Sequence, residues 1–215
     1  MNSAADPIAV QAPEQQYRAG AYALLAALLR DVPSPLVLQQ AAGLATLGDG
    51  KAHIKDQENH QNDLLAAMAS LGHAAQRIDS IALDDEFHAL FIGLGRGEVV
   101  PYGSWHMTGF LMEKPLGVLR SDLKTLGFER GPDIKEPEDH IAALFEVMAM
   151  LIQEEQNIDI QASFFARHLS SWADDFLADL ATAKSVDFYR AVARFATAFI
   201  AFERQYFGQE ELPDG

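Results

Sequence analysis

Apolar residues recur every three to four positions along most of the chain, and this period constrains the fold more than any other feature. In the stretch from 14 to 31, for example, Leu25, Leu28 and Leu29 have the spacing of one face of an α-helix. No segment of useful length shows the alternation of apolar and polar residues that is typical of a half-buried strand. The sequence therefore predicts an all-α protein.

Capping residues and helix breakers indicate where these helices begin and end. Ser34 and Pro35 have the residue types of an N-cap and of a first helical position, and Gly72 has that of a C-cap. The run Gly48–Gly50 is expected to form a turn. We expect helices over residues 14–31, 35–47, 53–71, 80–92, 114–126, 137–153, 159–181 and 185–206.

The charge balance and the absence of cysteine exclude several classes of function. The chain has 31 acidic and 16 basic residues, a formal net charge of -15, so its surface repels nucleic acid and attracts basic partners. It has no cysteine, which excludes disulfides, a thiolate nucleophile and a cysteine zinc site. No apolar run approaches the roughly 20 residues of a membrane span, and the first residues do not have the pattern of a secretory signal. We expect a cytoplasmic protein without stable membrane insertion.

The residue patterns that would support catalysis are incomplete. The glycine-rich run 93–97 resembles the start of a phosphate loop, but Glu98 stands where the dinucleotide fingerprint needs glycine. The seven histidines do not have the spacing of a zinc site. We therefore expect a binding protein, not an enzyme, with no bound metal or cofactor. The alternative is a metal- or GTP-dependent hydrolase that uses Asp139 and His140.

The first candidate for a binding surface combines Leu90 and Phe91 with the run Pro101–His106, which reads Pro-Tyr-Gly-Ser-Trp-His. This run is expected to place large aromatic side chains on a turn. Tyrosine and tryptophan on a loop offer contact area with little loss of entropy, which is typical of a peptide-binding surface. The alternative is that Tyr102 and Trp105 fill the core beneath the loop.

The second candidate is the segment 136–140, which reads Glu-Pro-Glu-Asp-His. Its proline is expected to open a helix, so Glu138 and Asp139 would lie in the first turn and complement the helix dipole. His140 falls on the same stripe as Leu144 and leans towards the buried face. A histidine at such a position is either a satisfied core residue or the rim of a polar pocket.

These two segments together resemble the TorD/DmsD family of cytoplasmic chaperones for molybdenum-containing oxidoreductases. The resemblance covers roughly residues 15–207, and the acidic string at its distance from the Pro-Tyr-Gly-Ser run is its most specific part. In this family tryptophan is frequent at the position of Tyr102, and Gly-Pro at that of Gly93-Leu94. The segments that carry the resemblance are Leu90–Gly93, Pro101–Ser104, Glu136–His140, His168–Trp172 and Phe188–Ala191.

The resemblance implies a bundle of about 9–11 helices in two lobes. The hinge contains Gly131-Pro132, and exchange of the second lobe across it would give a domain-swapped homodimer; the alternative is a monomer. We expect a disordered N-terminal tail at 1–13, an N-terminal lobe at 14–130, a hinge at 131–137 and a C-terminal lobe at 138–208.

The resemblance also implies a function. Members bind the twin-arginine signal peptide of an apo-molybdoenzyme of the dimethyl sulfoxide reductase superfamily, delay its export and assist cofactor insertion; weak contact with guanine nucleotide or molybdenum cofactor is compatible with this role. Carboxylates would hold the arginines of the peptide through forked hydrogen bonds. The sequence leaves open which oxidoreductase is the client, and whether the signal peptide or the folded body of the client is the main docking surface. The expected signal-peptide-binding residues are Leu90, Phe91, Pro101, Tyr102, Ser104, Trp105, Glu136, Glu138, Asp139 and His140.

Overall fold

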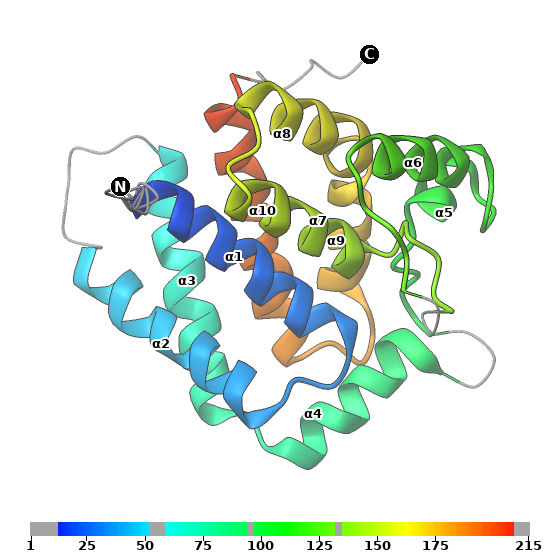
Figure 1. Cartoon of the computed structure of the whole chain (residues 1–215). Helices are drawn as coiled ribbons and strands as arrows, with labels where there is room; N and C mark the ends of the chain where they lie inside the picture. The colour runs from blue at the N-terminus through cyan, green and yellow to red at the C-terminus, as the bar shows by residue number, and fades with distance from the viewer. Residues whose placement is uncertain (1–12, 52–58, 94–96, 132–134, 209–215) are drawn as a thin grey trace, which may run out of the picture.

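The computed structural model describes residues 13–51, 59–93, 97–131 and 135–208, and this part of the chain is all-α (Figure 1). It contains ten α-helices and two short π-helices, so the predicted fold class is confirmed. The elements are α1 (Pro13–Arg30), α2 (Pro35–Lys51), α3 (Asn59–Arg77), α4 (Ser80–Phe87), η1 (His88–Ile92), α5 (Gly103–Thr108), α6 (Lys114–Thr125), α7 (Ile141–Gln153), α8 (Ile158–Phe165), η2 (Ala166–Ser170), α9 (Ala173–Thr182) and α10 (Phe188–Tyr206).

Helix α7 lies in the core because it is apolar on nearly all sides. Nine of its 13 residues are buried, as expected for a helix without a polar face. Helix α1 packs along α7 (Figure 1), where the rings of Tyr22 and Phe145 are 5.9 Å apart. Helix α10 packs against α3 and α9. Side chains from both halves of the chain therefore share one buried cluster.

The division into two lobes remains a prediction. Residues 1–12 of the expected tail and residues 132–134 of the expected hinge lie outside the described part of the chain, whereas Pro13 already begins α1. The packing of α1 on α7 joins the two expected lobes across a large contact.

A buried ion pair connects the first helix to the last. Arg18 donates to Glu203 through Nε at 2.6 Å and through Nη2 at 2.7 Å, and the two side chains are 1% and 0% exposed. Tyr22 Oη donates to the same carboxylate at 2.9 Å, and Arg18 Nη1 donates to Gln161 Oε1 at 3.0 Å. The forked geometry satisfies both charged groups away from water.

A buried glutamate holds the start of α10. The carboxylate of Glu86 on α4 accepts the backbone N–H groups of Asp187, Phe188 and Tyr189 at 2.7 to 2.9 Å. These N–H groups have no partner within their own helix, and a carboxylate at this end also complements the helix dipole. Glu86 is 6% exposed, so α4 and α10 are joined inside the protein.

The glycines of α2 and α3 are packing residues and do not end their helices. Helix α2 continues through the expected turn at Gly48–Gly50, and α3 continues past Gly72 to Arg77. A Cβ atom on Gly48 would lie 2.6 Å from the carbonyl oxygen of Leu65, and one on Gly72 would lie 2.2 Å from the amide nitrogen of Ala45. Both predicted ends were wrong because glycine here allows close approach of two backbones. Residues 53–58 of the expected third helix lie outside the described part.

Several other helix boundaries also differ from the prediction. The segment expected as one helix over 159–181 is divided into α8, η2 and α9 near Ser171 and Trp172, and α10 begins at Phe188. Helix α5 was not expected at all. The helix expected from Pro137 begins only at Ile141, which changes the roles of the acidic residues before it.

Candidate functional site

The two segments singled out in the sequence meet in the structure. The Gly103 N–H donates to the Asp139 carbonyl at 2.9 Å, and the Ile141 N–H donates to the Pro101 carbonyl at 2.9 Å. This short antiparallel pairing brings Tyr102 opposite His140. The aromatic run and the acidic string therefore form one structural unit.

Asp139 has one carboxylate oxygen in use and one without a partner. Its Oδ2 accepts the Ser104 N–H at 2.8 Å and thereby caps the start of α5. Its Oδ1 is buried and has no hydrogen-bond partner among the described residues, and the residue is 3% exposed. Since a buried carboxylate oxygen without a donor is unfavourable, this atom has acceptor capacity for a further hydrogen bond.

His140 is the N-cap of α7. Its Nδ1 accepts the Ala142 N–H at 3.1 Å. The expectation that Glu138 and Asp139 lie in the first helical turn was therefore wrong, because both residues precede the helix. The expectation that His140 leans towards the buried face is confirmed, since the residue is 5% exposed. Because Nδ1 is an acceptor, the ring is neutral with its proton on Nε2, and its 3.8 Å contact with Glu136 is not an ion pair at neutral pH.

Burial lowers the pKa of His140 to about 4 and Arg30 acts in the same direction, while the charges of Glu136 and Asp139 raise the pKa without reversing the effect. Burial also lowers the pKa of His168, whose Nε2 lies 2.8 Å from Asp122. Unfolded histidine binds its proton near pH 6.5. Between about pH 4 and pH 6.5, the unfolded chain therefore binds a proton at His140 that the folded chain does not bind. The free energy of unfolding falls as the pH falls through this range.

We expect His140 to lower the free energy of unfolding at pH 5 by about 2 kcal/mol relative to pH 7. Urea unfolding at the two pH values measures this difference. The variant His140→Asn retains an acceptor for the Ala142 N–H but does not titrate, so its loss between pH 7 and pH 5 should be smaller by that amount. Equal pH dependence in both proteins would contradict the assignment.

Two carboxylates of the acidic string have partners within the protein. Glu136 accepts the Tyr102 hydroxyl at 2.9 Å and lies 3.8 Å from Arg30 Nη1. Glu138 lies 2.9 Å from Arg120 and 3.8 Å from Arg130. Burial, followed by the bond to Glu136, raises the pKa of Tyr102. Arginines of a ligand would therefore have to share these carboxylates with arginines of the protein.

A mainly apolar pocket of about 350 Å³ opens beside Asp139, between α5 and α6. Gly103 lines it, and a Cβ atom there would lie 2.9 Å from the indole nitrogen of Trp172, so the close packing of this wall requires glycine. We call it the α5–α6 pocket. Its lining residues are Gly103, Ser104, Met107, Thr108, Lys114, Pro115, Val118, Leu119, Asp139, Leu144, Arg167, His168 and Trp172.

Exposed apolar side chains continue from this pocket onto the loop between α5 and α6. Met107 and Val118 line the pocket and are about half exposed, and Phe110 and Met112 on the loop are 68% and 70% exposed. Flexible methionines are suited to adaptable binding surfaces. These residues were not among the expected ones, although the apolar run from Met107 to Met112 in a segment without helical period was visible in the sequence.

The expected site residues do not all lie at this pocket. Ser104 and Asp139 line it, whereas Leu90 is fully buried in η1 and Phe91 packs on Tyr189 with ring centroids 5.3 Å apart. The remaining expected residues lie in or next to the paired segments: Pro101, Tyr102, Trp105, Glu136, Glu138 and His140.

Within the described residues, no group of three or more histidine, aspartate or glutamate side chains is arranged to hold a metal ion. Residues 94–96 of the glycine-rich run lie outside that part of the chain. None of the described helices combines the length and the apolar run needed to cross a bilayer.

Residues 57–178, more than half of the chain, match the model of the family described as nitrate reductase delta subunit. The chain belongs to this family. Among curated relatives, the chaperone protein TorD of Vibrio cholerae is 26% identical over 159 residues, covering 68% of this chain and 72% of the relative. TorD of Vibrio atlanticus is 26% identical over 164 residues, covering 68% and 76%. The resemblance to the TorD/DmsD family is thereby confirmed.

A solved structure supports the fold of this family member. It is that of a candidate redox enzyme maturation protein from Archaeoglobus fulgidus, with a TM-score of 0.55 and 19% sequence identity. The match covers 93% of this chain and 99% of that one. The similarity therefore extends over nearly all of both chains.

Proposed function

We propose that this protein is a cytoplasmic chaperone that binds the twin-arginine signal peptide of an apo-molybdoenzyme, delays its export and assists cofactor insertion. The TorD relatives are named chaperones, and the neighbour in fold is described as a maturation protein. The observation that carries the proposal is the α5–α6 pocket, which combines exposed apolar side chains with Asp139, whose Oδ1 has no donor among the described residues.

The chemistry of a twin-arginine signal fits these two features. Its apolar stretch would pack on Met107, Val118 and the exposed side chains of the α5–α6 loop, where burial of apolar surface favours binding. A donor from its polar part would reach Asp139 Oδ1. Its arginines would approach Glu136 and Glu138, and their acidic surroundings would speed the encounter and make it sensitive to salt.

This role needs no catalytic step and no resident cofactor. Asp139 accepts a backbone N–H at the start of α5, and His140 accepts one at the start of α7. These structural hydrogen bonds are consistent with residues that position the elements of a binding site. A metal analysis and a GTP-turnover assay test the hydrolase alternative, for which we expect no bound metal and negligible turnover.

Asp139→Asn is expected to weaken binding of the signal peptide about tenfold, because it removes one hydrogen bond to a charged acceptor. The asparagine oxygen can still accept the Ser104 N–H, but an amide donor then takes the place of Oδ1. Isothermal titration calorimetry with synthetic twin-arginine peptides of the organism's molybdoenzymes measures the change. The control is Asp179→Asn, an exposed carboxylate on α9.

A wild-type protein that binds none of these peptides would overturn the proposal. Unchanged affinity in Asp139→Asn would instead exclude Asp139 from the site. Capture of full-length oxidoreductases from the native cytoplasm, followed by mass identification, names the client.

A further inference from the structure

The arginines without an ion pair gather at one place. The described residues include nine arginines, and six of them lie within 4.0 Å of a carboxylate: Arg18, Arg30, Arg120, Arg130, Arg167 and Arg204. The other three, Arg77, Arg190 and Arg194, form no ion pair within the described part of the chain, and all three line the same pocket. Arg190 donates only to the carbonyl of Val186, at 3.2 Å.

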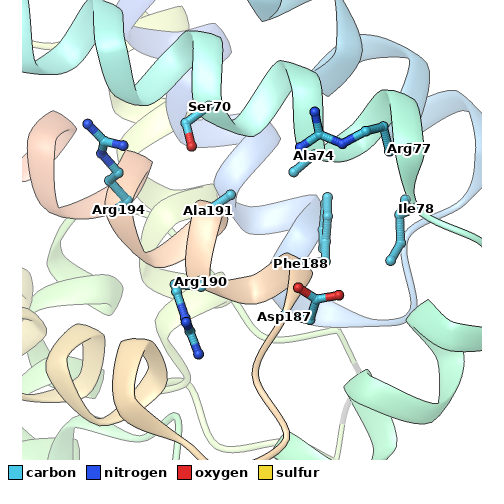
Figure 2. Close-up of a pocket in the computed structure, with 9 residues that line it drawn as sticks. All are labelled: Ser70, Ala74, Arg77, Ile78, Asp187, Phe188, Arg190, Ala191 and Arg194. Atoms are coloured by element: carbon cyan, nitrogen blue, oxygen red, sulfur yellow. The ribbon is translucent and has the colours of Figure 1, made fainter.

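This pocket, which we call the α3–α10 pocket, has a volume of about 360 Å³ and lies between the second half of α3 and the start of α10 (Figure 2). Ala74 and Ala191 give it small apolar walls. A second pocket of about 360 Å³ shares Arg190 and Arg194 and continues along α10 as far as Ala201. The two together offer an elongated surface along α10.

The charge of this surface is opposite to that of the whole chain. Three arginines and two acidic residues line the two pockets, with Asp187 in the first and Asp63 in the second, whereas the formal net charge of the chain is -15. Unpaired arginines in an acidic protein create a local positive potential that attracts anionic groups. Guanidinium groups also bind carboxylates in forked geometry.

The arrangement of the arginines favours an extended ligand over a small one. Figure 2 shows Arg77 along α3, Arg194 at the other end of the pocket and Arg190 pointing away from α3. A single phosphate group would need donors that converge on one point, which these do not. Carboxylates spaced along a polypeptide segment could each bind one of the three arginines.

We propose that the α3–α10 pocket docks an acidic segment of a protein partner. If the proposed function holds, this partner is the body of the client enzyme. The pocket shares no residue and no helix with the α5–α6 pocket, so the signal peptide and the body would bind to different surfaces of the chaperone at the same time.

Three ligands test the proposal in calorimetry: the client captured above with its signal peptide, the same client without it, and the peptide alone. The variant Arg77→Gln with Arg190→Gln and Arg194→Gln should bind the client without its signal peptide about tenfold more weakly than the wild type, and the peptide equally well. A control with Lys124→Gln, Lys135→Gln and Lys184→Gln has the same net charge and neutralises exposed residues elsewhere. It should bind both ligands almost as the wild type does.

The outcomes separate the two proposals. Binding of the peptide without any binding of the signal-less client would overturn the docking surface and leave the proposed function intact. Equal loss in the arginine and lysine variants would attribute the effect to net charge and would also overturn it. Failure of the wild type to bind any of the three ligands would remove the proposed function and this inference with it.

Discussion

Arg18→Ala is expected to lower the free energy of unfolding by about 3 to 5 kcal/mol. The carboxylate of Glu203 is 0% exposed. After the substitution it keeps the hydrogen bond from the Tyr22 hydroxyl but loses both bonds from Arg18. A charge that is buried without its counter-ion is far more unfavourable than an exposed one. Urea unfolding followed by circular dichroism at pH 7 measures the loss.

The control for this prediction is Arg167→Ala. Arg167 pairs with Asp122 at 2.7 Å, but its side chain is 55% exposed, so we expect a loss below about 1 kcal/mol. Replacement of both Arg18 and Glu203 by methionine should destabilise the protein less than the sum of the two single replacements. Losses of similar size in Arg18→Ala and Arg167→Ala would show that burial does not control the strength of the pair.

Glu86→Ala is expected to lower the free energy of unfolding by about 4 kcal/mol, because it leaves three N–H groups at the start of α10 without an acceptor. The effect is large since two of these groups, on Phe188 and Tyr189, are buried. Chemical unfolding measures the loss, and amide exchange of Phe188 and Tyr189 reports whether the first turn of α10 opens.

Glu98→Ala is the matched control for Glu86→Ala. Glu98 also accepts backbone N–H groups, those of Lys184 and Ser185 at 2.7 and 3.1 Å, but it is exposed to water. In Glu98→Ala, water can accept hydrogen bonds from these two N–H groups, so the loss of unfolding free energy should be much smaller. If the two variants were equally destabilised, the burial of Glu86 would not be the cause.

The helices that could be predicted from the sequence are those whose signals are local. Helix α6 was expected at 114–126 and lies at Lys114–Thr125, with Leu116, Leu119 and Leu123 buried as their spacing indicates. Helix α5 could not be predicted because it has only six residues and its cap is a side chain 35 positions away, that of Asp139. Gly48 and Gly72 have the residue type of a helix end, and only the neighbouring helix shows their packing role.

The candidate site was predicted in part, because residue types are local signals whereas contacts between distant segments are not. The residue types of Tyr102, Asp139 and His140 were visible in the sequence, and the structure brings these residues together. The unpartnered oxygen of Asp139 depends on contacts between distant segments. The arginines that approach Glu136 and Glu138 come from α1, from α6 and from the segment after α6, which no spacing within the acidic string could indicate.

The pairing of Pro101–Gly103 with Asp139–Ile141 has a consequence for how a protein with this fold can diversify. The stretch between these two segments begins and ends at their pairing. It contains α5, α6 and the exposed side chains of the loop between them. Surface loops on a rigid scaffold tolerate changes in sequence and length. The exposed side chains of this loop, such as Phe110 and Met112, can therefore change while the helices of the core keep their sequences.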